Sequence, residues 1–201
     1  GSAFDPDLPA GPVQPYHHEC PSDQCGTVPR HLQRAKYGLL FYRKEDPEEV
    51  AEEIVTLVQV RLSRHYRVPA SEIQVLTPMQ RGIVGAANLN QVLQEALNPN
   101  SPGLKRGGVT YRLRDKVMQI RNNYDKEVFN GDIGVILSVD KRERELTVEF
   151  DGRPVTYDVT ELDELVLAYA TTLHKAQGNE FPYVIMPLMK SHLYYSAIYS
   201  T

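Results

Sequence analysis

The amino-terminal half of the chain alternates between strand-like and helix-like patterns of apolar residues. Residues 37–42 are an apolar, aromatic run of strand length. Residues 46–49 then carry helix-start signals, because Asp46 is a good cap residue, Pro47 suits the first helical position and an acid follows three residues after the cap. Apolar residues continue at helical spacing on one face: Val50, Ile54, Leu57, Val58 and Leu62. This pattern predicts a helix that runs to about Tyr66 and packs on a sheet.

A second strand and a second helix follow. Residues 73–78 predict a strand that ends at Pro78. The next apolar residues at helical spacing are Leu89, Val92, Leu93, Ala96 and Leu97. They predict a helix that stops at Asn98-Pro99. Two strand–helix pairs in succession are typical of a parallel α/β layer.

From about Gly107 the apolar pattern changes from a helical period to the alternation of β-strands. Short strands are predicted at residues 117–120, 133–139, 145–150 and 153–157. Asn130-Gly131-Asp132 and Asp151-Gly152 are turn signals between them. Short strands at this spacing predict a small antiparallel β-barrel.

The pattern then reverts, with an apolar strand at residues 165–169, a turn and short helix at 171–177, and a buried strand at 183–187. The predicted fold class is therefore α/β: a parallel sheet with helices, interrupted by a small antiparallel β-barrel insertion. We predict three parts: a cleavage scar and proline-rich arm at residues 1–36, the α/β domain at 37–104 and 165–201, and the barrel at 105–164.

Composition excludes several classes of protein. The 201 residues are 41% hydrophobic and 24% charged, which is typical of a globular chain and not of a disordered one. No apolar run approaches the roughly 20 residues of a membrane-spanning helix, and no secretory signal peptide is visible, so we expect a cytoplasmic protein without a membrane partner. Cys20 and Cys25 lie near His17, His18 and His31, but no second cysteine pair completes a zinc ribbon. We therefore predict no metal site, and whether the two cysteines form a disulfide bond stays open.

The segment at residues 168–181 carries the most informative chemistry. An apolar strand leads into Thr171 and Thr172, either of which can cap the predicted short helix. Free backbone N–H groups at such a helix start attract anions, and His174 and Lys175 add donors that suit a phosphodiester. The plainer alternative is a capped helix with solvated polar residues.

This segment resembles motif V of superfamily 1 helicases, and it is most similar to the RecD-like branch. Residues 75–82, with Leu89-Asn90 and Leu93-Gln94, resemble the motif IV region. Residues 115–125 and 128–134 resemble the entry into the SH3-like barrel that this family inserts. The resemblance covers about residues 37–190, with the blocks in the family's order.

The resemblance implies the second RecA-like motor domain, with an SH3-like barrel, of an ATP-dependent DNA helicase that moves from 5′ to 3′. Single-stranded DNA would lie across both motor domains, and ATP with Mg²⁺ would bind between them. Residues implied to touch the DNA backbone are Thr171, Thr172, His174 and Lys175. Gly178 and Glu180 would couple that contact to the nucleotide, and Arg81 would face the nucleotide cleft. Residues 122–124 are interpreted as a turn scaffold rather than as a contact.

The net charge of −4 disfavours binding of nucleic acid through the field of the whole protein. The first predicted helix is acidic, whereas the approach to the barrel is basic. Around the single acid Asp115, this stretch contains Lys105, Arg106, Arg112, Arg114, Lys116 and Arg121. We expect Arg112, Arg114 and Lys116 to contact DNA phosphates.

Parts of the family pattern are missing. The sequence has no Gly-Lys pair for a phosphate loop, and its Asp163-Glu164 pair precedes a strand instead of ending it as a Walker B motif does. We expect the first RecA-like domain, upstream, to supply both, so that this chain alone binds no ATP or Mg²⁺, hydrolyses no ATP and unwinds no DNA. The arginine of the family's last motif is absent from residues 193–201, and Arg114 stands where the family leads us to expect glycine.

Two other classes of function stay open. The chain is alternatively a non-catalytic nucleic-acid-binding or adaptor module that kept the motor fold. A third reading is a protein-interaction barrel on an enzyme scaffold, because a fold does not determine its function.

Overall fold

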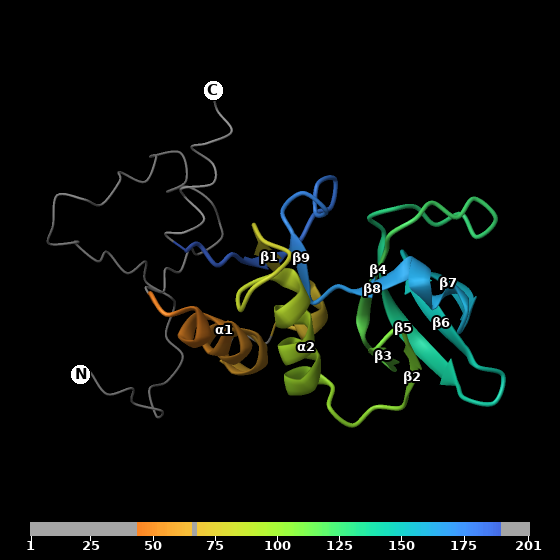
Figure 1. Cartoon of the computed structure of the whole chain (residues 1–201), viewed down its shortest axis with the longest axis horizontal. Helices are drawn as coiled ribbons and strands as arrows, with labels where there is room; N and C mark the ends of the chain where they lie inside the picture. Colours follow the sequence, from red (N-terminus) through yellow and green to blue (C-terminus); the bar gives the residue numbers. More distant parts are fainter. Residues whose placement is uncertain (1–43, 66–67, 190–201) are drawn as a thin grey trace, which may run out of the picture. The chain divides into compact units, whose positions relative to one another are not determined.

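A computed structural model describes residues 44–65 and 68–189 of the chain, with the fold shown in Figure 1. The predicted strand at residues 37–42 lies outside the described residues, and so do Cys20 and Cys25. Among the described residues, no helix is both long and apolar enough to cross a membrane.

The first helix, α1 (Pro47–Thr56), begins as the sequence predicts. The Asp46 carboxylate accepts hydrogen bonds from the backbone N–H groups of Glu48 at 2.7 Å and Glu49 at 3.4 Å. These bonds satisfy donors that a helix start otherwise leaves unpaired. Beyond Thr56 the chain continues as a π-helical segment, η2 (Leu57–His65). The change of helix type follows the β-branched run Ile54–Thr56, whose stiff side chains lower α-helix propensity.

A three-stranded parallel sheet has the strand order β10-β1-β9. The 3₁₀ turn η3 (Ala70–Glu72) leads into the central strand β1 (Ile73–Thr77), which is buried at every residue. Such continuous burial is typical of a parallel strand that is covered on both faces. β9 (Ala170–Thr172) and β10 (Tyr183–Ile185) flank β1. The prediction of a buried strand at 183–187 was wrong in its burial, because β10 is an edge strand of the described sheet and Val184 is 47% exposed.

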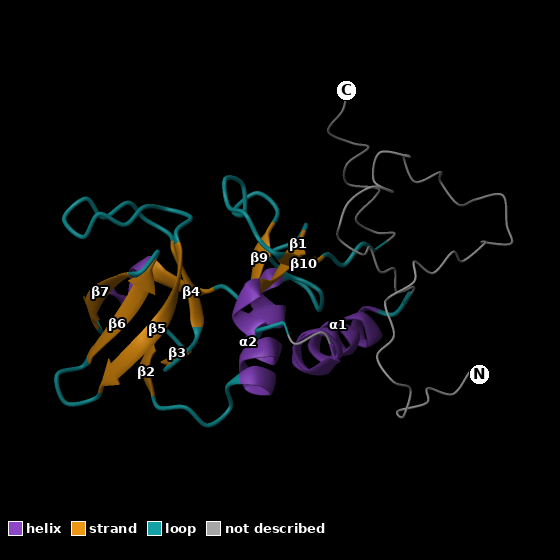
Figure 2. Cartoon of the chain, turned by 180° about the vertical axis from the view of Figure 1, so that it is seen from behind, coloured by secondary structure: helices purple, strands orange, loops and turns teal. Residues whose placement is uncertain are grey.

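Helix α2 (Ala86–Leu97) packs against β9, as Figure 2 shows. Leu89 and Leu93 are buried, so the predicted amphipathic helix is confirmed, but Val92, which the pattern assigned to the same apolar set, is 36% exposed. Asn90 adds a polar clamp: its amide donates to the carbonyl of Ala170 and accepts from the N–H of Ala170, both at 2.8 Å. The helix therefore holds the backbone at the start of β9.

A short hairpin that the sequence pattern did not reveal lies at the start of the region predicted as the barrel. β2 (Gly103–Arg106) and β3 (Val109–Arg112) pair antiparallel around Gly107-Gly108. The Tyr111 hydroxyl donates to the carbonyl of Leu165 at 2.6 Å. Both strands are only four residues long, which is too short for an alternating pattern to stand out.

The remaining strands form a five-stranded antiparallel sheet in the order β7-β6-β5-β4-β8. Its strands are β4 (Lys116–Gln119), β5 (Ile133–Asp140), β6 (Glu145–Phe150), β7 (Arg153–Asp158) and β8 (Leu165–Leu167). Asp151 and Gly152 both have positive φ, at 48° and 78°, as the tight mirror-image hairpin turns require. The predicted strands and this turn are confirmed.

The expected closed barrel is not observed, because β7 and β8 are the two edges of the described sheet. The predicted strand at residues 165–169 is also two strands in two different sheets. β8 pairs with β4 of the antiparallel sheet, and β9 pairs with β1 of the parallel sheet. The chain leaves β8 after three residues and crosses to the other sheet, so β8 cannot extend to close the ring.

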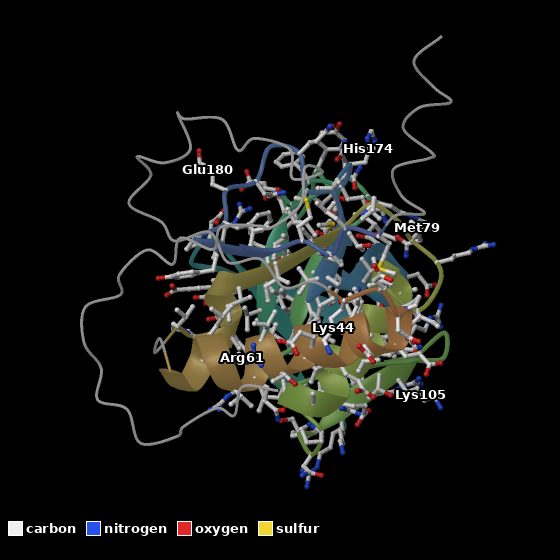
Figure 3. The ribbon with its side chains drawn as sticks, turned by 90° about the vertical axis from the view of Figure 1, so that its left-hand side faces the viewer. Lys44, Arg61, Met79, Lys105, His174 and Glu180 are labelled. Carbon is white, nitrogen blue, oxygen red and sulfur yellow. The ribbon has the colours of Figure 1, made fainter. Side chains whose placement is uncertain are left out.

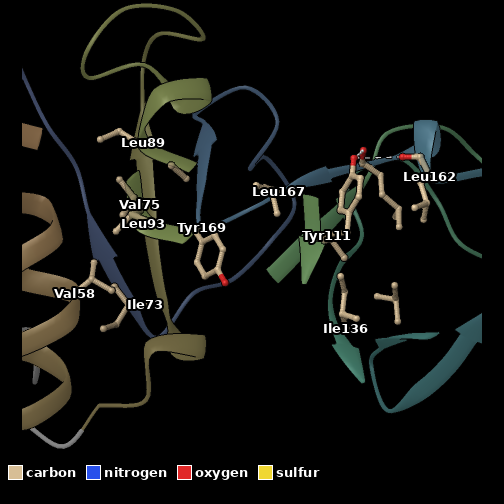
Figure 4. Packing of buried hydrophobic residues seen from close by; sticks show 14 of the residues in the cluster. Val58, Ile73, Val75, Leu89, Leu93, Tyr111, Ile136, Leu162, Leu167 and Tyr169 are labelled. Atoms are coloured by element: carbon tan, nitrogen blue, oxygen red, sulfur yellow. Dashed lines mark hydrogen bonds between the residues drawn. The ribbon is translucent and has the colours of Figure 1, made fainter. Parts of the chain in front are cut away.

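Buried side chains of both sheets belong to one hydrophobic cluster. Figure 4 shows Val75, Leu89 and Leu93 on one side and Tyr111 and Ile136 on the other. The segment between β8 and β9 joins the two groups. The parallel sheet and the antiparallel sheet are therefore packed as neighbours, and a change in one can affect the other.

Candidate functional site

The loops that follow β1 and β9 leave from the same edge of the parallel sheet. The two strands are parallel neighbours, with Thr77 opposite Thr172, and the N–H of Leu173 donates to the carbonyl of Thr77 at 3.1 Å. Carboxyl ends of adjacent parallel strands form the usual ligand-binding edge of an open α/β sheet. The structure therefore brings the loop with Arg81 to the same edge as the loop with His174 and Lys175.

The short helix predicted after Thr172 is wrong. Residues 173–178 form turns, in which the N–H of Ala176 donates to the carbonyl of Thr172 at 3.1 Å. The Thr172 hydroxyl accepts from the N–H of Lys175 at 3.4 Å, so it caps a turn and not a helix. Gly178 has a φ of +91°, a conformation that favours glycine, and it redirects the chain before a helix can grow. The anion-binding helix start that the sequence predicted at this point is therefore not formed, and no helix dipole contributes to anion binding there.

The predicted site residues differ in exposure. Thr171 is 4% exposed, and its hydroxyl accepts from the Gln74 amide at 3.3 Å. Thr172 is half-buried, whereas the other members of the predicted site are exposed: Arg81, His174, Lys175, Gly178 and Glu180. Figure 3 shows His174 and Glu180 toward one end of the view and Lys105 toward the opposite end. Thr171 therefore helps to hold β9 in place through its hydrogen bond with Gln74. The exposed residues are the ones that a ligand could contact.

The basic stretch at residues 105–121 does not form one continuous patch. Arg106 pairs with Asp163 at 2.8 Å. Arg112 pairs with Glu95 and also donates to the carbonyl of Asn98 at 2.9 Å. The exposed members of the stretch are Lys105, Arg114 and Arg121.

Lys116 is buried, with 7% of its surface exposed. Its ammonium donates to the backbone carbonyls of Ser71 at 3.0 Å and Ile73 at 3.4 Å, and it lies 5.8 Å from the centre of the Phe181 ring. Burial lowers the pKa of this amine to about 8, because desolvation disfavours the charged form. Lys116 thus ties β4 to the chain around the start of β1, and we leave it out of the DNA contact.

The low pKa of Lys116 predicts a rise in stability with pH. Between the folded pKa of about 8 and an unfolded pKa of about 10.4, the unfolded chain binds more protons than the folded chain. The free energy of unfolding then rises with pH, by about 2 kcal/mol from about pH 7 to about pH 9.5. Urea unfolding should show this rise in the wild type and lose it in Lys116→Met, and Lys105→Met is the matched exposed control.

Parallel pH profiles for the wild type and Lys116→Met would contradict this assignment. The comparison stays below about pH 10 because tyrosines oppose the trend at higher pH. Burial raises the pKa of Tyr111 to about 12, so the folded chain keeps that proton longer than the unfolded chain does, and stability falls again.

Arg114 occupies a backbone conformation that favours glycine. Its φ is +71°, in the left-handed region, and its N–H donates to the carbonyl of Ile136 at 2.8 Å. A residue with a β-carbon is strained there by about 1–2 kcal/mol relative to glycine. This positive φ explains in conformational terms why the resemblance leads us to expect glycine at position 114.

The Asp115 carboxylate accepts four hydrogen bonds between the two sheets, and sequence reasoning assigned it no role. It is fully buried. One carboxylate oxygen accepts from Asn98 at 2.7 Å and from the Tyr169 hydroxyl at 2.9 Å. The other accepts from the Gln94 amide and, at 2.7 Å, from the N–H of Arg112.

Burial raises the pKa of Asp115, and these hydrogen bonds to the carboxylate oppose that shift. The pKa of Tyr169 is also raised, first by burial and then by the neighbouring carboxylate. Tyr169 immediately precedes β9. Asp115 therefore connects α2, the β2–β3 hairpin and β4 to the start of the site strand. A lone acid between Arg114 and Lys116 was the only signal of this role in the sequence.

Metal binding has no candidate in the described part of the chain. No group of three or more His, Cys, Asp or Glu side chains there is placed to hold an ion. Asp163 and Glu164 are used otherwise: Asp163 pairs with Arg106, and Glu164 accepts from Gln119 at 2.9 Å and from Asn123 at 3.1 Å.

Comparison with known proteins identifies the class. Residues 89–150 match the family model described as the SH3 domain of ATP-dependent RecD-like DNA helicases. This range runs from α2 through β6. The chain carries the SH3 domain of this helicase class, and the resemblance that the motifs indicated is confirmed.

Two curated relatives agree with this class. The ATP-dependent RecD2 DNA helicase of Deinococcus radiodurans is 39% identical over 133 residues, which make up 63% of this chain and 18% of that protein. The RecBCD enzyme subunit RecD of Haemophilus influenzae is 28% identical over 122 residues, or 61% of this chain and 18% of that protein. The chain thus matches about a fifth of the length of each relative.

Among solved structures, the Bacteroides Pif1 helicase in complex with ADP-AlF3 and single-stranded DNA covers 79% of this chain. The match extends over 48% of the Pif1 chain, with a TM-score of 0.46 and 15% sequence identity.

Proposed function

We propose that this chain is part of an ATP-dependent DNA helicase of the RecD-like class that moves from 5′ to 3′ on single-stranded DNA. In this proposal the parallel sheet with α1 and α2 belongs to the second RecA-like motor domain, and the antiparallel sheet is its SH3-like insertion. The main observation behind the proposal is the position of the loop after β9. This loop exposes His174 and Lys175 at the carboxyl edge of the parallel sheet, beside the loop with Arg81.

The DNA backbone is proposed to lie over the loop after β9. Lys175 supplies a full positive charge and His174 supplies a ring N–H donor, both from exposed side chains. Thr172 adds a half-buried hydroxyl, while buried Thr171 acts by positioning the strand. Arg114, which is exposed, is a further phosphate contact in the proposal, and Arg112 is a weaker candidate because Glu95 already pairs with it.

ATP and Mg²⁺ fit this chain only in part. The sequence has no Gly-Lys pair for a phosphate loop, whereas the exposed guanidinium of Arg81 suits contact with a nucleotide phosphate. We propose that the first motor domain supplies the phosphate loop and the Mg²⁺ ligands. Arg81, Gly178 and Glu180 then border the cleft from this chain's side. Bound ATP supplies, through its hydrolysis, the free energy for movement along DNA.

The proposal predicts salt-dependent binding of single-stranded DNA through Lys175. Anisotropy of a labelled oligothymidylate, titrated with the 201-residue chain at several salt concentrations, measures it. Lys175→Ala removes one phosphate contact, so it should weaken binding and reduce the slope of log K against log salt by about 0.7. Lys105→Ala, an exposed lysine on a different element, should leave both quantities unchanged.

Two results would overturn this proposed contact. The first is an absence of binding to the oligonucleotide even at low salt. The second is an equal effect of Lys175→Ala and Lys105→Ala, which would indicate a nonspecific response to net charge. Strand displacement by the full-length protein, compared on duplexes with a 5′ or a 3′ single-stranded tail, tests the polarity and separates a motor from an adaptor that binds without unwinding.

A further inference from the structure

The loop between β4 and β5 displays two aromatic rings to solvent. Tyr124 is 74% exposed and Phe129 is 45% exposed. Their ring centres are 6.0 Å apart at an interplanar angle of 76°, so they form an edge-to-face pair. In Figure 1 this loop is the green segment that extends beyond the ends of β4 and β5. We call Tyr124 and Phe129 the aromatic pair.

This loop is held firmly, so the exposure of the aromatic pair does not come from a loose segment. Asn123 and Val128 exchange backbone hydrogen bonds of 2.8 and 3.0 Å, and each of these two residues directly precedes one member of the aromatic pair. Lys126 donates to the carbonyl of Thr156 at 2.9 Å and pairs with Glu161 at 2.6 Å. These contacts attach the loop to the antiparallel sheet and to η4 (Glu161–Glu164). A fixed loop that presents two rings can bind a ligand with little loss of conformational entropy.

The basic side chains beside the aromatic pair are already paired within the protein, and Asp125, next to Tyr124, is an exposed acid. Lys126 is neutralised by Glu161, and Glu127 pairs with Arg153 at 2.5 Å. The pair therefore lacks the free positive charge that a phosphate contact needs. Flat, weakly polar ligands that stack on aromatic rings suit it instead, and nucleobases are such ligands.

The aromatic loop also adjoins the proposed DNA contact. The Asn179 amide, in the loop after β9, donates to the carbonyl of Gly131 at 3.3 Å. Gly131 lies two residues beyond Phe129, whose N–H donates to Asp132 at 2.8 Å. A DNA strand that is bound over His174 and Lys175 would therefore pass next to the loop between β4 and β5, which carries the aromatic pair.

We propose that Tyr124 and Phe129 form a stacking platform for unpaired bases of single-stranded DNA. This inference rests on the proposed function, because it assumes that DNA binds at the loop after β9. The platform reads no sequence, since every base has a flat face, and it adds affinity that does not depend on salt. Residues 122–124 then combine both roles considered for them, because Asn122 and Asn123 hold the turn and Tyr124 meets the ligand.

Binding of oligothymidylate by the whole chain tests the platform. Tyr124→Ala and Phe129→Ala should each weaken binding at least about fivefold, with an unchanged salt slope because no phosphate contact is lost. Tyr124→Phe keeps a ring and should retain most of the affinity. Leu137→Ala removes another exposed apolar side chain, which is 47% exposed on β5, and should have no effect.

A second measurement reports stacking directly. The chain contains no tryptophan, so Tyr124→Trp introduces a single indole at the platform. Oligothymidylate should quench its fluorescence, whereas an abasic oligomer of the same length should bind more weakly and leave it nearly unquenched.

The outcomes separate this inference from the proposed function. Loss of binding in Lys175→Ala, with full binding in the Tyr124→Ala and Phe129→Ala double variant, would overturn the platform and leave the backbone contact intact. No binding by the wild type would overturn both. Equal quenching of Tyr124→Trp by the two oligomers would also overturn the platform. The same holds if the double variant binds DNA normally but loses an aromatic-dependent interaction with a peptide.

Discussion

Replacing Asp115 with alanine is expected to lower the free energy of unfolding by about 3–5 kcal/mol, the range seen when a buried, paired polar group is removed from its partners. Its two carboxylate oxygens serve every donor in the group: Gln94, Asn98, the Arg112 N–H and the Tyr169 hydroxyl. Alanine leaves these buried donors without an acceptor, and each unsatisfied donor costs about 1–3 kcal/mol. Urea unfolding followed by circular dichroism measures the change.

Asp115→Asn keeps the volume of the side chain and tests the chemistry separately from the packing. All four partners donate hydrogen bonds to the carboxylate. In asparagine an NH₂ group replaces one acceptor oxygen and would lie against two of these donors, so this variant should also be strongly destabilised. Tyr169→Phe removes a single bond and should cost less. Asp163→Ala, at an exposed acid that pairs with Arg106, should leave the unfolding midpoint almost unchanged. A stable Asp115→Asn would refute the acceptor role.

Replacing Gly134 with valine is expected to destabilise the protein by about 3 kcal/mol or more, because the site is already full. A β-carbon at this position would lie 2.5 Å from the carbonyl oxygen of Glu149, and within 2.9 Å of side-chain atoms of Val148 and Phe150. The nearest atom is backbone of the paired strand β6 and cannot turn aside as a flexible side chain would. Thermal unfolding should show a large drop in midpoint, and Gly134→Ala should show a smaller one in the same direction.

Ser138→Val is the matched control on the same strand. Ser138 is exposed and lies opposite Thr147, where a β-branched residue suits a strand. This variant should have a midpoint close to that of the wild type. If Gly134→Val were equally well tolerated, the close approach of β5 and β6 at Gly134 would be incorrect.

The elements that sequence reasoning predicted correctly depend on short-range signals. The start of α1 needs only the Asp46 side chain and the next three residues. The β6–β7 hairpin needs only Asp151-Gly152 and two alternating strands. The apolar stripe of α2 repeats within one helix, so its buried face was also predictable.

The errors arose where distant segments decide the outcome. Thr171 and Thr172 offered the signals of a helix start, but residues 173–178 form only turns before the chain continues to β10. Residues 165–169 read as one apolar strand, because local pattern does not tell which neighbouring strand each residue will meet. Lys116 read as a surface cation, although it lies under Phe181 and binds carbonyls near β1.

By itself the sequence indicated the resemblance to RecD-like helicases and the segment that carries the candidate chemistry, because the order of motifs and the residue types at residues 168–181 are properties of the chain alone. Tertiary structure decided which of those residues are exposed to solvent. It buried Thr171 and Lys116, exposed Tyr124 and Phe129, and made Asp115 the connection between the two sheets. The physical reason is that burial and pairing depend on contacts between residues far apart in sequence. Asp115 and Tyr169, separated by 54 positions, form such a contact.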